Sequence, residues 1–159
     1  MSAKTDLLKS RLENSRAFVN RVLDQVGDRW ETQVYEDGPG WNVRQILVHV
    51  ADSETGLMRT AKAIVAGENP VPPDFDIDRY NARKTEKTAD TTVEQARASM
   101  AESHAALLQW IDTLNDEDLE KEGRHPTLLI FSVEKFIKIM SAHQRDHLTD
   151  VARKLNITA

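Results

Sequence analysis

Two histidines four residues apart are the first sign of chemistry in this sequence. His143 and His147 lie in the segment Ser141-Ala142-His143-Gln144-Arg145-Asp146-His147. On a helix, this spacing places both imidazoles on one face, one turn apart, where they can bind one metal ion. Zinc metalloproteases use the same spacing with a glutamate directly after the first histidine. Gln144 stands there instead, which excludes that kind of site. The spacing also fits two hydrogen-bonded polar residues at the margin of a core.

A third histidine lies on another predicted helix. His49 is about 120° around that helix from the centre of its apolar stripe, whereas His147 and His143 are about 40° and about 80° from the centre of theirs. A flank position can face the seam between two helices, so three imidazoles could meet there. Three protein ligands would leave one or two coordination positions open, as in catalytic sites. Taken alone, His49 also fits a histidine at the solvent edge, and His104 fits a surface or seam position.

Three carboxylates near these histidines have different expected roles. Glu54 falls near the centre of an apolar stripe, and buried carboxylates are normally paired. An arginine partner is therefore favoured over a role as hydrogen-bond acceptor for a ligating histidine. Asp146 and Asp150 lean outward on their helix, so we expect both to be solvated.

Length and composition limit the class of protein. The chain has 159 residues, which predicts a single domain over residues 1–159. Its net charge of −5 disfavours nucleic acid or an anionic membrane as the main partner. The absence of cysteine excludes disulfides, thiolate metal ligands and a cysteine nucleophile. No apolar run is long enough to span a bilayer, and the first residues do not resemble a signal peptide, so we expect a cytoplasmic protein.

Helical periodicity dominates the elements that must position the histidines. We predict helices over residues 4–26, 42–66, 91–114 and 132–155, with Asn42 and Ser132 as N-caps and a capping box from Thr91 to Glu94. This pattern predicts an all-α four-helix bundle with a long crossover, residues 68–90, between helices 2 and 3. The crossover could contain a short helix at 78–87 and leave those two helices parallel. Residues 115–123 read as an acidic turn, and 128–131 as a lone strand candidate without a partner.

Three short motifs resemble those of DinB-like proteins. They are the segment 41–54, from Trp41 through His49 to Glu54, the segment Asp74-Phe75-Asp76-Ile77-Asp78-Arg79-Tyr80-Asn81, and the paired-histidine segment 143–147. The resemblance implies a DinB-like four-helix bundle that holds a divalent metal through His49, His143 and His147, and a homodimer. The superfamily includes thiol-dependent transferases and isomerases, such as bacillithiol transferases and mycothiol-dependent maleylpyruvate isomerase.

The function implied by this resemblance is that of a metal-dependent enzyme. A divalent transition metal, with zinc and nickel ahead of iron, would activate a low-molecular-weight thiol cosubstrate or water for attack on a small-molecule electrophile. The reaction would be that of a thiol transferase or a hydrolase, with Tyr80, Asn81 and His125 as candidates to line the pocket. One alternative is a non-catalytic metal-binding or stress-response bundle, closed by a fourth ligand such as Glu54. Another is a helical interaction domain without metal.

Overall fold

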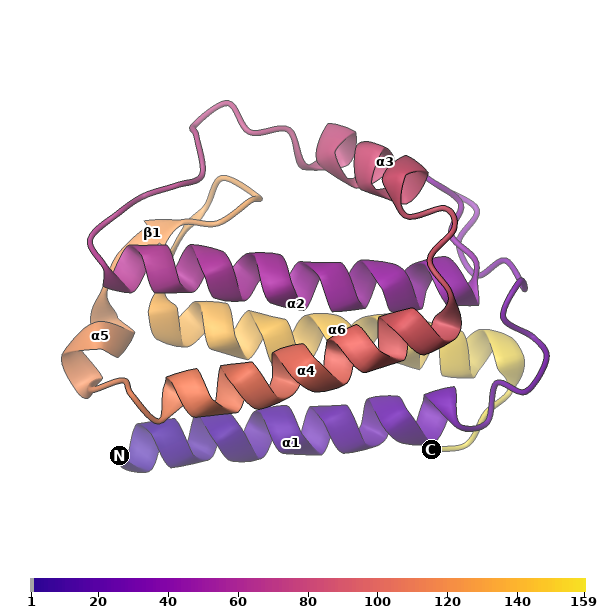
Figure 1. Ribbon diagram of the computed structural model, residues 1–159, viewed down its shortest axis with the longest axis horizontal. Helices are drawn as coiled ribbons and strands as arrows, with labels where there is room; N and C mark the ends of the chain where they lie inside the picture. The colour runs from indigo at the N-terminus through magenta and orange to yellow at the C-terminus, as the bar shows by residue number, and fades with distance from the viewer. Residues whose placement is uncertain (1) are drawn as a thin grey trace.

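The computed structural model describes residues 2–159, and four long helices form its body (Figure 1). They are α1 (Ala3–Leu23), α2 (Val43–Val65), α4 (Val93–Ile111) and α6 (Val133–Leu155). Helix α1 packs mainly against α6, and α2 packs against both α4 and α6. The predicted all-α four-helix bundle is therefore confirmed. Over residues 2–159, no helix is both long and apolar enough to cross a membrane.

The predicted crossover connects α2 to α4 along the length of the bundle. The chain leaves α2, returns over the outside of the bundle, and forms the short helix α3 (Ile77–Lys87) before it enters α4 (Figure 1). As a result, α2 and α4 run in the same direction, and α1 and α6 run in the opposite one. No residue of α3 is buried, so this helix is attached to the bundle surface rather than packed into its core.

Side-chain caps fix where the helices begin. Asn42 accepts from the backbone N–H of Gln45, and the Gln45 side chain accepts from the backbone N–H of Asn42, so α2 begins with a complete capping box. Ser132 caps α6 as predicted. The prediction for α4 was one residue too early, because the capping pair is Thr92 with Gln95 rather than Thr91 with Glu94.

The stretch 115–132 differs most from its prediction. It was expected to be an acidic turn and an unpaired strand, but it forms helix α5 (Asp116–Glu120) and a hairpin of β1 (Glu122–Arg124) with β2 (Ile130–Ser132). The pairing is antiparallel, with Gly123 opposite Phe131. Gly123 lies so close to Ile64 of α2 that a Cβ atom would be 2.5 Å from its side chain. Glycine is usually taken as a sign of a turn, but Gly123 lies in a strand, where its lack of a side chain permits close packing on a helix.

Apolar side chains fill the bundle as two clusters, one toward each end. One cluster gathers residues from the C-terminal half of α1 and the N-terminal half of α2, and the other gathers residues from the opposite halves. Between them lies a buried polar layer to which each long helix contributes one residue. Its members are Arg16 of α1, Glu54 of α2, Ser103 of α4 and Gln144 of α6.

The buried polar layer is centred on one arginine. The Arg16 guanidinium donates to the Glu54 carboxylate at 2.7 Å, to the Gln144 side-chain oxygen at 3.1 Å and to the backbone carbonyl of Met100 at 2.8 Å. The Ser103 hydroxyl donates to the second oxygen of Glu54. Glu54 is 5% exposed, and its predicted pairing with an arginine is confirmed. Because Arg16 reaches three other helices, the layer fixes their relative axial positions.

We predict that Glu54→Leu lowers the free energy of unfolding by about 3–5 kcal/mol, because it leaves the charge of Arg16 buried without its partner. The double variant Arg16→Met/Glu54→Leu removes both charges and should recover more than half of that loss. Urea unfolding of Glu54→Leu, Arg16→Met and the double variant gives the coupling energy between Arg16 and Glu54. A loss below about 1 kcal/mol for Glu54→Leu would contradict a stabilising role for the pair.

Candidate metal centre

The three histidines singled out in the sequence meet at the seam between α2 and α6. His49 projects from the second turn of α2, and His143 and His147 project from consecutive turns of α6. The Nε2 atom of His143 is 3.2 Å from that of His49 and 3.1 Å from that of His147. One nitrogen from each ring can be chosen so that all three lie within 4.8 Å of one another. The three rings are partly buried.

The spacing of these nitrogens suits one tetrahedral ion. Ligand atoms 2.0–2.1 Å from a zinc-sized ion at tetrahedral angles are about 3.3 Å apart, close to the two Nε2 separations. The chemistry of the donor set agrees, because zinc, nickel, copper and iron all accept imidazole nitrogen. The residues therefore fit a divalent transition metal.

A tyrosine orients one of the three rings. The Tyr35 hydroxyl donates to the Asp150 carboxylate at 2.7 Å, so its oxygen is left to accept a hydrogen bond from His147 Nδ1, which is 2.8 Å away. The hydrogen of neutral His147 then sits on Nδ1, and Nε2 presents its lone pair to the other two histidines. This is the usual arrangement behind a metal-binding histidine. Asp150 was predicted to be solvated, but its side chain is only 38% exposed and forms this hydrogen bond.

Burial keeps the three imidazoles uncharged. Desolvation, together with the neighbouring imidazoles, lowers the pKa of His49 to about 3 and that of His143 to about 4. Desolvation also lowers the pKa of His147, against the opposing effect of Asp150 and Asp146. Each ring is therefore neutral at pH 7, and a neutral imidazole is the form that binds a metal ion.

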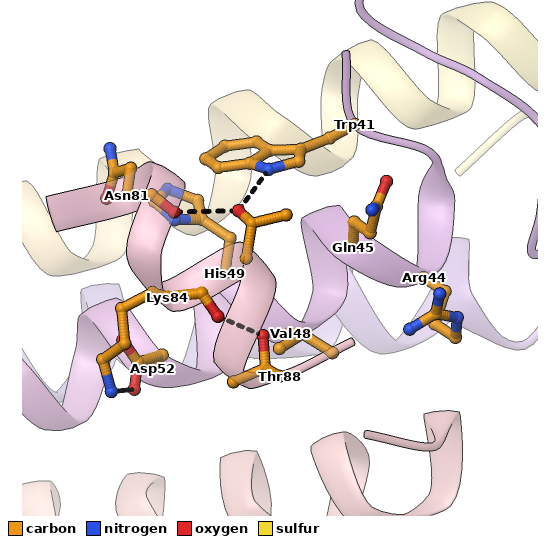
Figure 2. Close-up of a pocket in the computed structure, with 10 residues that line it drawn as sticks. Trp41, Arg44, Gln45, Val48, His49, Asp52, Asn81, Lys84 and Thr88 are labelled. Carbon is orange, nitrogen blue, oxygen red and sulfur yellow. Dashed lines mark hydrogen bonds and ion pairs between the residues drawn. The ribbon is translucent and has the colours of Figure 1, made fainter. Parts of the chain in front are cut away.

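Trp41 covers the cluster on the α2 side. Its indole packs on the His49 ring with centroids 4.2 Å apart, and its N–H donates to the Thr85 hydroxyl of α3 at 3.0 Å. Figure 2 shows the shallow pocket that results between α2 and α3, with Asn81 and Lys84 on its α3 side. Lys84 forms an ion pair with Asp52 of α2 at 2.9 Å.

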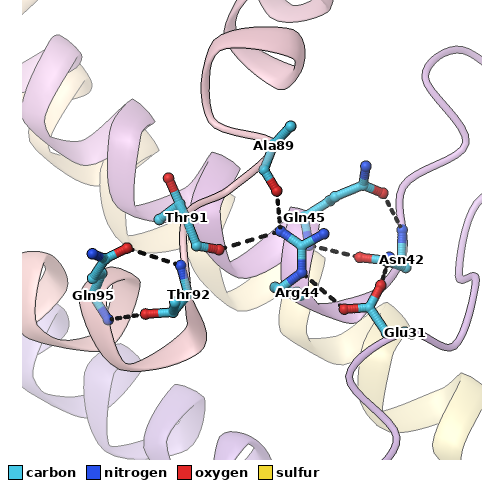
Figure 3. Close-up of polar contacts among 8 residues, drawn as sticks. All are labelled: Glu31, Asn42, Arg44, Gln45, Ala89, Thr91, Thr92 and Gln95. Atoms are coloured by element: carbon cyan, nitrogen blue, oxygen red, sulfur yellow. Dashed lines mark hydrogen bonds and ion pairs between the residues drawn. The ribbon is translucent and has the colours of Figure 1, made fainter.

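Arg44 connects the loops on either side of Trp41 and α3. Its guanidinium donates to Glu31 at 2.9 Å and to the backbone carbonyls of Ala89 and Thr91, each at 3.3 Å (Figure 3). Glu31 also accepts from the Asn42 amide at 2.8 Å. One arginine therefore holds both the loop that carries Tyr35 and the C-terminal end of the crossover.

The other residues expected near the site have separate positions. Asn81 lines the pocket beside His49, whereas Tyr80 is 40% exposed, packs on Phe75 and does not line that pocket. His125 is buried in the turn of the hairpin. His104 borders a different cavity, between α1 and α4, at the seam position that was one of its two interpretations.

Sequence reasoning missed Tyr35 and Asp150 as partners of His147. Tyr35 lies in the irregular loop before α2, where no periodicity predicts which way a side chain points. The backbone N–H groups of Val34 and Tyr35 both donate to the carbonyl of Trp41, and this doubling back brings the tyrosine over α6. Only the fold of the loop reveals this contact.

Comparison with known sequences identifies a superfamily and several relatives. The pattern of the DinB superfamily matches residues 8–151. The Bacillus subtilis protein "Putative metal-dependent hydrolase YfiT" is 28% identical over 148 residues, which is 91% of this chain and 82% of YfiT. An Oceanobacillus iheyensis protein also named "Putative metal-dependent hydrolase" is 29% identical over 139 residues, 86% of this chain and 76% of that protein.

Solved structures share the fold. The structure of Bacillus subtilis YfiT aligns with a TM-score of 0.74 at 24% identity, covering 99% of this chain and 91% of that one, and it is described as having "an unusual four-helix bundle topology". An uncharacterised protein from Clostridium difficile 630 aligns with a TM-score of 0.76 at 15% identity, covering 100% of this chain and 99% of its own. At these identities the likeness supports the fold alone.

We predict that the metal-free protein loses stability as the pH falls from about 6.5 toward 4. In that range the histidines of the unfolded chain take up protons, whereas His49 and His143 in the folded chain, with lower pKa values, do not. Each such histidine contributes a slope of up to about 1.4 kcal/mol per pH unit. Urea unfolding in the presence of a chelator measures it. His49→Gln should reduce the slope, and Glu102→Gln, which changes an exposed carboxylate on α4, should not; equal slopes in all three proteins would contradict the prediction.

Proposed function

The chain belongs to the DinB superfamily, and from its three-histidine cluster we propose that it is a divalent-metal-dependent enzyme that acts on a small electrophilic molecule. The observation that carries this proposal is the convergence of three neutral imidazoles, His49, His143 and His147, on one point at the α2–α6 seam. A set of three protein ligands leaves coordination positions for water or substrate, and such open positions are typical of catalytic metal sites.

The residues of this chain would hold the ion and protect its surroundings. The three histidines would be the ligands, and imidazole nitrogen suits zinc, nickel and iron. When bound, such an ion lowers the pKa of a water or thiol and makes it nucleophilic at neutral pH. Tyr35 and Asp150 orient His147, while Trp41 shields one face of His49 from solvent.

Hydrolysis is the reaction that we favour. Two relatives that match most of the chain are named as metal-dependent hydrolases, and a water nucleophile requires no further cosubstrate. Transfer of a low-molecular-weight thiol is the second candidate; the chain has no cysteine, so the thiol would be a cosubstrate that enters from outside. A non-catalytic role predicts a fourth ligand, but Glu54 is already bound to Arg16 and Ser103, which counts against it as that ligand. A cytoplasmic location and a homodimer stay predictions.

We predict that the wild-type protein binds close to one equivalent of transition metal and that His143→Ala/His147→Ala does not. Elemental analysis of protein purified without a tag or chelating resin measures this. His104→Ala is the matched control, since His104 is a partly buried histidine outside the cluster and its removal should leave the metal content unchanged. If the wild type remains metal-free after reconstitution with zinc, nickel and iron, the proposal is overturned.

The same proteins separate hydrolysis from thiol transfer. Metal-loaded wild type should hydrolyse members of a panel of chromogenic esters and amides, and the double histidine variant should not. The cobalt-substituted protein should change its visible spectrum on titration with a small thiol only if thiols enter the open positions. A loaded protein that hydrolyses no panel member and shows no spectral response to thiols would favour the non-catalytic alternative.

We predict that Tyr35→Phe weakens metal binding by about 10–100-fold, because His147 loses the acceptor that fixes its hydrogen on Nδ1. Competition with a chromophoric chelator gives the dissociation constant. Tyr80→Phe provides the control, because the side chain of Tyr80 packs on Phe75 rather than on the histidines. An unchanged affinity in Tyr35→Phe would show that the tyrosine does not orient the site.

A further inference from the structure

A buried histidine in the hairpin turn carries an unpartnered hydrogen-bonding atom. The His125 side chain is 8% exposed and packs between the rings of Phe131 and Phe136, with centroids 5.5 and 5.4 Å away. Its Nε2 atom is buried and has no hydrogen-bond partner among residues 2–159. Buried polar groups in native proteins nearly always have a partner, so an exception calls for an explanation.

The turn determines which nitrogen of His125 carries the hydrogen. Its Nδ1 accepts from the backbone N–H of Thr127 at 3.1 Å and lies 2.8 Å from the Thr127 hydroxyl. A backbone N–H can only donate, so Nδ1 must hold a lone pair and the hydrogen of the neutral ring sits on Nε2. The unpartnered atom is therefore an N–H donor, and it needs an acceptor that the described chain does not supply.

The His125 ring lies on the side of α6 that carries His143. The ring of His125 contacts Phe136 of α6, and Phe136 lies seven residues before His143. A separation of seven residues is close to two helical turns, so both side chains lie on the same face, about 10 Å apart along the axis. His125 also contributes to the low pKa of His143, which means that the two imidazoles are close enough to interact.

The backbone beside His125 is strained. Leu128 has a φ of 72°, a left-handed conformation that is rare for a leucine, while Leu128, Leu129 and Ile130 are exposed at the tip of the hairpin. Within this turn the backbone N–H groups of His125 and Leu128 donate to the carbonyls of Leu129 and His125. These hydrogen bonds hold the turn that places the Thr127 backbone N–H as a donor to His125 Nδ1. Strain of this kind often accompanies a functional position.

We propose that the Nε2–H of His125 binds an oxygen of the substrate, at a point removed from the atom that reacts at the three-histidine cluster. The substrate then extends along α6 from the cluster to the hairpin and carries a carbonyl or similar acceptor at its far end. This inference rests on the proposed function and adds a substrate class to it: a bifunctional molecule with an electrophilic centre and a second oxygen acceptor. His125 would determine specificity and would not ligate the metal.

The test uses pairs of monocarboxylates matched in length and charge. The cobalt-loaded protein is titrated with 4-oxopentanoate, 5-oxohexanoate and 6-oxoheptanoate, and with pentanoate, hexanoate and heptanoate. Each carboxylate can occupy the metal, but only the oxo-acids offer a second acceptor. At least one oxo-acid should bind about 3–10-fold more tightly than its matched acid, as expected for one added hydrogen bond. His125→Phe should abolish this advantage, and His125→Gln, which retains an N–H donor, should restore part of it.

A second measurement does not depend on a variant that folds. In zinc-loaded wild type, the ¹H–¹⁵N signal of His125 Nε2–H should shift on addition of the preferred oxo-acid and not on addition of its matched acid. If the ion and the simple acids bind but no oxo-acid has an advantage and the signal does not move, the inference about His125 fails and the proposed function stands. If no ion binds, the proposed function itself fails. A crystal structure with an ordered water that joins Nε2 to other protein groups, and that the oxo-acid does not displace, would also overturn the inference.

Discussion

The buried ion pair between Arg16 and Glu54 is the constraint on which the arrangement of the bundle depends. Apolar packing specifies the axial position of a helix less strictly, because a core tolerates exchange of its apolar side chains when total volume and patterning are kept. A buried charge specifies it more strictly, since each displaced hydrogen bond leaves a desolvated polar group. Arg16 reaches Glu54 of α2, Met100 of α4 and Gln144 of α6, so all four long helices share one level. The two apolar clusters then pack on either side of that level.

The same layer sets the geometry of the three-histidine cluster. Gln144 is the immediate neighbour of His143, and Glu54 lies five residues after His49 on α2. Fixing Gln144 and Glu54 to one arginine therefore fixes the heights at which His143 and His49 face each other across the seam. A slip of α2 by one residue would move its imidazole by about 1.5 Å along the axis and about 100° around it. Such a slip would destroy a site whose nitrogens are only 3.1–3.2 Å apart. The stability of the core and the precision of the site thus have a common origin.

The parts that sequence could predict are those governed by helical periodicity. Spacing and burial along a helix predict the four helices and the crossover with its short helix. They also predict the caps Asn42 and Ser132 and the pairing of Glu54. The same reasoning placed His143 and His147 on one face. It could not place Tyr35, whose contact with His147 depends on a loop held by Trp41 and Arg44. Nor could it pair Ile130–Ser132, because the partner strand Glu122–Arg124 is short and has an ordinary polar sequence. Where helical spacing and burial govern a contact the sequence was sufficient, and where loops meet helices it was not.

The structure also separates the helical bundle from the segments that lie around the site. The bundle supplies the three histidines from α2 and α6, elements that are capped and buried. The loop with Tyr35 and Trp41 and helix α3 lie over the histidines, and the hairpin with His125 lies farther along α6, against Phe136. These segments attach through polar contacts, such as Arg44 to the crossover carbonyls and Trp41 to Thr85, and through apolar packing of Trp41, Tyr35 and Phe131 on the core. A change in these segments can alter what reaches the histidines without moving them, because the layer that positions the histidines lies inside the bundle. A fold built in this way can keep one metal chemistry while its substrate is decided by short surface segments, and this is why we look for specificity in the hairpin rather than in the helices.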